Sequence, residues 1–308
     1  MLKVRFNAMK YFFVFLIYVA CSCASLPKVN TLIYENDFEE GVENSKILNR
    51  IKSNGLSNSH NLSFQYSKGS EENRYARIVP DPLNENNNVL DMNISSKGLE
   101  ARQRVQASFS SVPNLKEIRQ TVRVFFSPDM EHLTQYQNAF TWLILAEWWN
   151  SAPKNWNTPN VYRVSLRAVK AEGNNKSLHF KVDAQSVTYS KQRPRMGTGA
   201  IFKTEWEKTN KKFVIPYGKW LTFEYHIKAG DSENGLFYMS VTPDDGKKQV
   251  IFNIKGATQS LNYNENQSYN FWSPMKLYTS DEISDFMLKN RKSLQVYFDD
   301  LKVWKLNN

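Results

Sequence analysis

Apolar and polar residues alternate along most of the chain, in short runs rich in valine, isoleucine and aromatic residues. Alternation of this kind is typical of β-strands that bury one of their two faces. A first strand is predicted from Thr31, ending in an acidic turn at Asp37 to Glu39. The later alternating runs are residues 62–66, 88–94, 99–109, 118–126, 140–149, 162–169, 178–188, 220–228, 236–242, 250–254 and 294–304.

One helix interrupts the strands. Thr279-Ser-Asp-Glu282 has the spacing of a capping box, and Ile283, Phe286 and Met287 then share one face. The pattern therefore predicts a short helix near residues 280–290. Many strands and a single helix predict an all-β fold, a two-sheet antiparallel jelly-roll β-sandwich formed as one domain by residues 24–308.

The first 23 residues have the pattern of a signal peptide. Lys3, Arg5 and Lys10 precede an apolar run of ten residues, 11–20, which is too short to span a bilayer. Ala20-Cys-Ser-Cys23 resembles the lipobox of bacterial lipoproteins, which implies lipidation at Cys23. The alternative is ordinary cleavage near Ala24, with both cysteines lost. Either way we expect an exported protein, on the bacterial cell envelope or surface or secreted, with a lipid anchor as its one link to a membrane.

The net charge of +10 favours anionic partners. We do not expect nucleic acid as a partner of an exported protein, whereas an acidic polysaccharide fits that compartment. The four histidines lack metal-ligand spacing, and no Ser-His-Asp arrangement or phosphate-binding glycine loop is present.

The polar faces of several predicted strands are rich in cationic and hydrogen-bonding residues. Because the opposite faces are apolar and must form the core, these polar faces line the outside of the sandwich. Each polar residue on them is either part of a binding surface or simply solvated. The candidates for substrate binding are Arg102, Arg104, Arg163, Arg167, His179 and Glu224, joined by Trp149 on the strand at 140–149.

The strand at 140–149 differs from this background. Strict alternation places Thr141, Leu143, Leu145, Glu147 and Trp149 on one face, which is apolar until it reaches the carboxylate. Burying a carboxylate is costly unless it is paired or bound. Glu147 is therefore either a buried structural carboxylate or a site residue, and the indole beside it favours a sugar site.

The order of motifs resembles the concanavalin A-like lectin/glucanase superfamily, and within it the jelly-roll polysaccharide lyases and related secreted proteins. The resemblance rests on Arg102-Gln-Arg-Val105, Phe126-Ser-Pro-Asp129, Trp142 to Trp149, Pro216-Tyr-Gly-Lys-Trp220 and Tyr297 to Trp304. It implies that Arg102 and Arg104 lie near the first site strand, Ala146-Glu-Trp148 on the second, and Tyr278 on a late one. The chain lacks the glutamate and the histidine that the alginate-lyase-like branch carries on the first two strands.

These observations favour a protein that binds a polysaccharide, in glycan capture or breakdown. One alternative is an enzyme that cleaves the glycan. A lyase would use His226 or Tyr278 as base, with Arg102, Arg104 or Arg163 neutralising the uronate. A hydrolase would need two carboxylates, for which Glu147 and Glu224 are the candidates. Another alternative is a structural envelope lipoprotein.

The two ends of the chain carry a second resemblance. In many sandwich carbohydrate modules an early Asp-Phe-Glu turn and a late Asp-Asp pair hold a structural calcium ion, and oxygen ligands suit that cation. Here the corresponding residues are Asp37, Glu39, Asp299 and Asp300. The alternative is a pair of solvated acidic turns. No other cofactor is expected.

Overall fold

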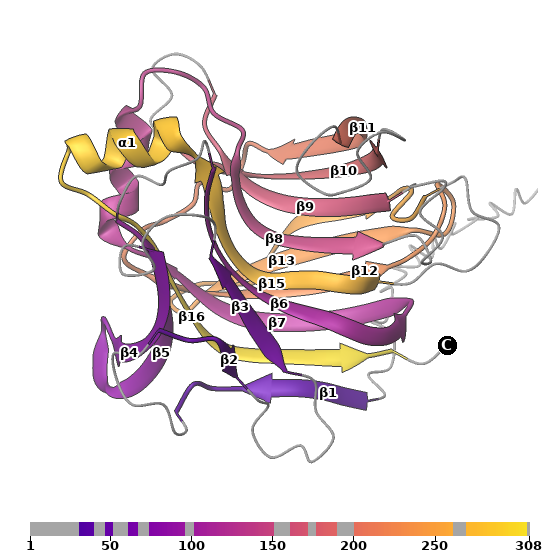
Figure 1. Ribbon diagram of the computed structural model, residues 1–308, viewed down its shortest axis with the longest axis horizontal. Coiled ribbons are helices and arrows are strands. Elements are labelled where there is room, and N and C mark those ends of the chain that lie inside the picture. Colours follow the sequence, from indigo (N-terminus) through magenta and orange to yellow (C-terminus); the bar gives the residue numbers. More distant parts are fainter. Residues whose placement is uncertain are drawn as a thin grey trace, which may run out of the picture.

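Two antiparallel sheets of eight strands each form the protein in a computed structural model (Figure 1). The predicted antiparallel β-sandwich is confirmed. The structure describes residues 31–39, 47–51, 61–66, 74–95, 102–150, 161–171, 177–189, 200–260 and 269–306. The predicted signal peptide and the predicted lipidation site at Cys23 lie outside these ranges.

Sheet A has the strand order β14-β13-β12-β7-β16-β5-β4, with β1 paired to β16. Pairing of β1 with β16 places Asn36 opposite Leu301, so the first and last described strands are neighbours. The strands are β1 (Thr31–Asn36), β4 (Arg74–Asp81), β5 (Asn84–Ile94), β7 (Glu117–Phe126), β12 (Trp220–Lys228), β13 (Leu236–Pro243), β14 (Gln249–Lys255) and β16 (Leu294–Lys305).

Sheet B has the order β11-β10-β9-β8-β15-β6-β3-β2. Its strands are β2 (Arg50–Ile51), β3 (Leu62–Tyr66), β6 (Arg102–Leu115), β8 (Leu143–Asn150), β9 (Val161–Val169), β10 (His179–Tyr189), β11 (Ala200–Asn210) and β15 (Tyr269–Ser280). The inner faces of both sheets meet in one large hydrophobic cluster. Trp148 of sheet B, for example, packs on Tyr225 of sheet A with ring centroids 5.1 Å apart, and such buried aromatic pairs supply much of the burial energy.

The sequence missed four strands, β2, β4, β11 and β15. β11 is an edge strand that is exposed over most of its length, so it lacks the alternation that burial imposes. β15 contains Pro274 and shifts register against both neighbours around it, which interrupts the period.

The helix α1 (Asp281–Lys289) is present where it was predicted, but the capping box is wrong. Ser280 is the N-cap residue and makes no side-chain cap bond. The Thr279 hydroxyl donates instead to the carbonyl of Trp142, at 2.6 Å. A second helix, the 3-10 helix η1 (Pro128–Gln135), forms where the sequence predicted none. Within the described ranges, no helix is long and apolar enough to cross a membrane.

A β-bulge in β8 corrects the predicted face of Glu147. The pairing with β9 shifts between Ile144 and Ala146, so Leu145 is an extra residue and the alternation changes phase there. Leu143 and Leu145 lie in the core together with Ala146 and Trp148. Glu147 and Trp149 do share a face, but it is the outer face of sheet B.

Candidate functional site on the outer face of sheet B

A row of polar side chains crosses the outer face of sheet B, one from each of seven neighbouring strands. Register places Gln65 opposite Gln106, Gln106 opposite Lys276, and Gln185 opposite both Arg163 and Thr204. Contacts between side chains join the remaining members. We call this set the polar row, and from β3 to β11 it consists of Gln65, Gln106, Lys276, Glu147, Arg163, Gln185 and Thr204.

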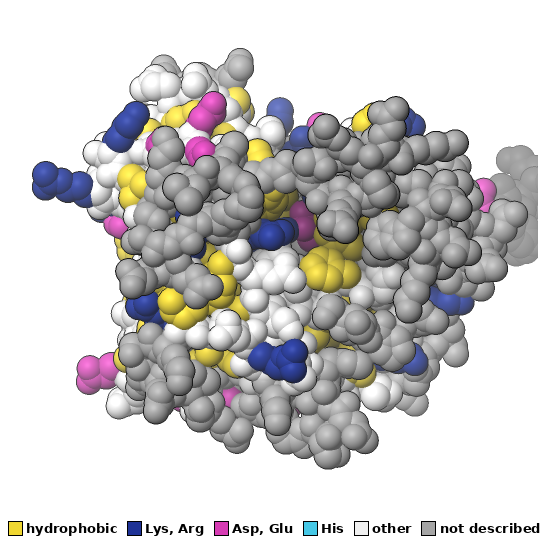
Figure 2. All heavy atoms as spheres, viewed as in Figure 1, with side chains coloured by type: hydrophobic (Ala, Val, Ile, Leu, Met, Phe, Trp, Pro, Cys, Tyr) yellow, Lys and Arg dark blue, Asp and Glu magenta, His cyan; other side chains and the backbone are white. Residues whose placement is uncertain are grey.

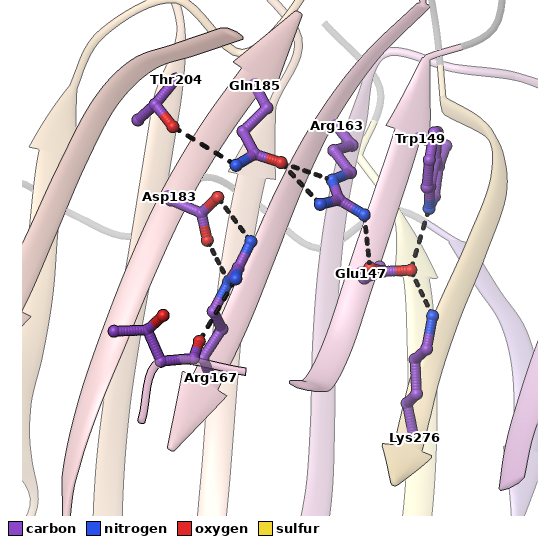
Figure 3. A network of polar contacts seen from close by, with 9 residues as sticks. Glu147, Trp149, Arg163, Arg167, Asp183, Gln185, Thr204 and Lys276 are labelled. Atoms are coloured by element: carbon purple, nitrogen blue, oxygen red, sulfur yellow. Dashed lines mark hydrogen bonds and ion pairs between the residues drawn. The ribbon is translucent and has the colours of Figure 1, made fainter. Parts of the chain in front are cut away.

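Glu147 lies at the middle of the polar row and is 1% exposed (Figure 3). Its Oε1 accepts a hydrogen bond from Nη1 of Arg163 at 3.2 Å. Its Oε2 accepts from Nε1 of Trp149 at 3.1 Å and from the ammonium of Lys276. Three donors on one buried carboxylate satisfy the requirement that a buried charge be paired.

The charge state of Glu147 follows from these neighbours. Burial acts to raise its pKa, but the ammonium of Lys276 and the guanidinium of Arg163 outweigh burial and hold the pKa at about 2. Glu147 is therefore ionised at any physiological pH. A glycosidase acid needs the opposite shift, so Glu147 is unsuited to donate a proton to a leaving group.

Lys276 is also buried, with a side chain that is 3% exposed. Burial lowers its pKa to about 8, against the opposing effect of Glu147. Its Nζ lies 4.8 Å from the ring centroid of Tyr278, on the same strand and face. Near neutral pH this ammonium thus loses its proton far more readily than an exposed lysine does.

Arg163 connects the centre of the row to its β11 end. Its Nε and Nη2 donate to Oε1 of Gln185 at 2.9 and 2.6 Å, and Nε2 of Gln185 donates to Thr204 at 3.3 Å. The guanidinium also lies 5.3 Å from the ring centroid of Trp149 and 4.4 Å from that of Phe202. The two rings and the acceptor oxygens of Gln185 and Glu147 together hold the guanidinium of Arg163 in one orientation.

A second ion pair lies beside the polar row. Arg167 contacts Asp183 at 2.5 Å and donates to the carbonyl of Thr141 at 3.2 Å. Burial raises the pKa of Asp183, and Arg167 opposes that effect. Farther along the same face, Lys181 pairs with Glu207 at 2.7 Å. The cations at this end of the sheet are therefore matched by carboxylates.

Arg104 differs from the other cations of this face. Its guanidinium lies 5.9 Å from the ring centroid of Tyr278, which itself packs edge-on against Trp142 at 5.2 Å. All three side chains are half-buried. The Nε of Arg104 is buried without a hydrogen-bond partner, and Arg104 forms no ion pair within the described ranges. A half-buried cation of this kind suits an anion supplied from outside.

The outer face can be followed in the space-filling view. In the middle of the face in Figure 2, basic, acidic and hydrophobic side chains lie next to one another among polar groups. The hydrophobic members on this side of sheet B include a small cluster of Trp149, Val161 and Val187 with half-buried Phe271. Aromatic residues next to charged and amide groups are the composition of a sugar-binding surface.

Sheet B thus brings together most of the site residues predicted from the sequence. Glu147, Trp149, Arg104, Arg163, Arg167 and Tyr278 all lie on it. His179 starts β10, where its Nδ1 lies 3.0 Å from the carbonyl oxygen of Phe213, so it faces a loop of the fold. Arg102 is part of β6, but its side chain lies outside the described residues.

Glu224 and His226 lie elsewhere, on β12 of sheet A. Glu224 pairs with Arg119 at 2.7 Å and Lys248 at 2.5 Å, and His226 Nε2 lies 2.6 Å from Glu117. The core residues Phe223 and Tyr225 alternate with them, so both point away from sheet B. The predicted hydrolase pair of Glu147 and Glu224 is therefore wrong, and His226 lies on the other sheet from the cations Arg104 and Arg163 that a lyase base would need.

The sequence did not single out Lys276, Gln185 or Trp142. Alternation in Lys276-Leu-Tyr278 would have put Lys276 beside Tyr278 had β15 been recognised as a strand. The polar face of the run at 178–185 already contained Gln185. No sequence signal predicted the contact of Trp142 with Tyr278, since it depends on how β8 and β15 align.

The two acidic turns near the chain ends do meet, at Asn87 and Asn88 of β5. Glu39 accepts from the backbone N–H and side-chain amide of Asn88, at 2.9 and 3.1 Å. Asp299 accepts from Asn87 at 3.2 Å and from Arg123 at 3.4 Å. Among the described residues, no group of three or more His, Cys, Asp or Glu side chains could hold a metal ion. An amide and a guanidinium occupy the oxygens that calcium would need, so Asp37, Glu39, Asp299 and Asp300 fit that ion poorly.

Comparison with known proteins finds no matching family model and no matching curated sequence. Solved structures do match. The endo-β-1,4-glucuronan lyase of the fungus Trichoderma reesei is 13% identical, with 85% of this chain and 96% of that chain covered and a TM-score of 0.45. An alginate lyase mutant in complex with alginate tetrasaccharide is 10% identical, covering 79% and 87%, at a TM-score of 0.43. The PL-14 alginate lyase of Aplysia kurodai is 12% identical, with 77% of this chain and 89% of that chain covered and a TM-score of 0.39.

The chain resembles polysaccharide lyases in fold. At such identities and scores the likeness concerns the arrangement of strands alone. What the face of sheet B can do is argued from its own side chains.

Proposed function

We propose that the protein binds an acidic polysaccharide across the outer face of sheet B. The observation that carries this proposal is Arg104, a half-buried guanidinium without an anionic partner within the described chain. It lies over Tyr278, the ring that Lys276 and Trp142 also contact. A carboxylate on a sugar supplies the missing charge, and the rings supply apolar surface for the pyranose.

Affinity electrophoresis over acidic and neutral glycans tests this proposal, with nucleic acid as a negative control. We expect retardation by acidic glycans and loss of at least about tenfold in affinity for Arg104→Gln, since a charged hydrogen bond contributes about 1.5–3 kcal/mol. The matched control is Lys248→Gln, which removes a cation from sheet A and should change nothing. Absence of retardation on every acidic glycan would overturn the proposal.

A second candidate is cleavage of the bound polymer by β-elimination. A lyase needs a base for the proton next to the uronate carboxyl and a cation to stabilise the resulting charge. Tyr278 is half-buried and faces Arg104 and Lys276, so the base and the neutralising cation are present together. Lys276 itself is too buried to reach a substrate without movement.

Ultraviolet absorbance of unsaturated uronate separates the two candidates. A lyase produces this absorbance from an acidic glycan, and Tyr278→Phe abolishes it while binding persists. Binding without any unsaturated product on the glycans that bind would exclude the lyase and leave the binding protein. Hydrolysis by Glu147 is disfavoured because the predicted second carboxylate, Glu224, lies on the other sheet, and a pKa of about 2 makes Glu147 unsuited to be the general acid.

Location outside the cytoplasm is part of the proposal and rests on residues 1–23 alone. Lipid attachment at Cys23 is tested by fatty-acid labelling of the full chain. Cys23→Ser should abolish the label and release the protein from the membrane fraction. Unchanged labelling of Cys23→Ser would show that the fatty acid is attached to another residue.

A further inference from the structure

Charge is distributed unevenly along the polar row. At its centre, Arg104, Lys276 and Arg163 face a single carboxylate, Glu147, which leaves an excess of two positive charges. Toward β11, Arg167 and Lys181 are matched by Asp183 and Glu207. Within the polar row and the residues beside it, the excess positive charge therefore lies on β6, β15 and β9, around β8.

Within the polar row, the two ends carry amides and hydroxyls instead of charge, and the nearest cation beyond the β3 end is Arg50 of β2, which is exposed opposite Ser63. At the β3 end the exposed amide is that of Gln65, which accepts from Gln106 at 3.0 Å, and the buried Gln106, Ser108 and Ser273 support it through further hydrogen bonds. At the other end, Gln185 donates to the exposed Thr204. Groups that both donate and accept hydrogen bonds suit sugar hydroxyls and bring no net charge to a uronate.

The length of the row sets the size of the ligand. Seven strands at the usual spacing of 4.7–4.9 Å make a row of about 29 Å. One strand spacing is close to the length of one sugar in an extended polymer. A chain lying along the row would thus place several sugars over it, with those at the centre near the excess charge.

We infer that the polysaccharide for this face is a mixed polymer, in which isolated acidic sugars are separated by neutral ones. This inference rests on the proposed function and narrows its substrate class. A polymer with a carboxylate on every sugar would place most of its charges over neutral or balanced parts of the face. Those carboxylates would lose water without gaining a cation, which is unfavourable. An isolated uronate meets Arg104 at the centre, while its neutral neighbours meet the amides.

The test varies charge on a constant backbone. Polyglucuronate and alginate are used intact and after stepwise reduction of their carboxyl groups to alcohols, and affinity is measured by calorimetry at several salt concentrations. We expect affinity to persist or rise until few carboxylates remain, and to fall about tenfold or more when none is left. The slope of log affinity against log salt should correspond to about one or two ionic contacts, since each contact adds to the slope.

Two variants check the same point from the protein side. Arg104→Gln should lower the salt slope by about one and weaken binding of the sparsely charged polymer. Gln185→Ala should weaken binding several-fold for every degree of reduction, with the slope unchanged. Lys203→Gln, which removes an exposed cation of β11 paired with Glu205, is the control for charge alone.

The outcomes separate the two levels of proposal. Affinity that falls in proportion to each carboxyl group removed, with a steep salt slope for the intact polymer, overturns the mixed-polymer inference and leaves acidic polysaccharide binding in place. Absence of binding to every polymer, at every degree of reduction, overturns the proposed function itself. Retained affinity at low charge density supports both.

Discussion

Glu147 on the outer face of sheet B and Asp91 on the outer face of sheet A are both almost fully buried, yet their pKa values move in opposite directions. Burial raises the pKa of Asp91 to about 7, with weaker opposing effects from Gln295 and Tyr75. The amide of Gln295 donates to both oxygens of Asp91, each at 3.1 Å. Glu147 is held at about 2 by two cations. The comparison teaches that the charge of the partners, more than burial, decides whether a buried carboxylate is ionised.

The two faces also differ in what surrounds these carboxylates. Outside sheet A, Phe125, Trp220 and Val89 form a buried apolar cluster, with Tyr297 packed against it. Outside sheet B, Glu147 lies between Arg163 and Lys276, near Arg104, which has no ion pair among the described residues. Guanidinium groups lie over aromatic rings on both faces, as Arg123 over Trp220 does on sheet A, so the faces differ in whether cations contact the buried carboxylate.

The largest expected effect comes from removing the charge of Glu147. Glu147→Gln leaves Arg163 and Lys276 buried without a counter-charge, which costs about 3–5 kcal/mol of folding free energy. Urea unfolding at pH 7 measures the loss. Glu207→Gln, at a largely exposed carboxylate paired with Lys181, is the control and should change stability by less than about 1 kcal/mol. A loss below about 1 kcal/mol for Glu147→Gln would show that the two cations do not depend on it.

A smaller effect, of opposite sign, is expected at Asp91. Because its folded pKa lies above its unfolded value, its contribution to stability is present at acid pH and is lost as pH rises through about 7. Wild-type protein should therefore lose about 2 kcal/mol attributable to this group between pH 5 and pH 8. Asp91→Asn keeps the shape of the side chain and removes its titration.

The measurement is the free energy of unfolding of both proteins at each pH. The variant should approach or exceed wild-type stability at pH 8 while being less favoured at pH 5. Parallel pH profiles for the two proteins would contradict the raised pKa. Such a result would also remove the contrast between the two faces.

The smallest effect is expected at the two acidic turns near the chain ends, where Glu39 and Asp299 lie beside Asn88 and Asn87. Since Arg123 and the asparagine amides already satisfy Glu39 and Asp299, we expect chelator and added calcium to leave the unfolding temperature unchanged within about 1 °C. A clear rise with calcium that the chelator reverses would restore the predicted calcium site. Asp300→Asn would then be expected to weaken it.

Much of the site could be predicted because alternation assigns faces within a single strand. Arg163 and Arg167 lie on the face opposite Val164 and Leu166, as the period of two requires. The pattern failed at Leu145, where one extra residue moves Glu147 from the predicted apolar face to the outside. A bulge has no mark in the sequence, because it depends on how the neighbouring strand pairs.

By itself, the sequence determined the fold class, since period-two alternation in more than ten runs allows little besides packed sheets. It also determined the basic and aromatic character of the strands that form the face. Only the tertiary structure decided which of these residues meet. It placed Lys276 and Arg163 on either side of Glu147 and moved Glu224 and His226 to the other sheet. The physical reason is that strand order and register join residues far apart in the chain, and local periodicity contains neither.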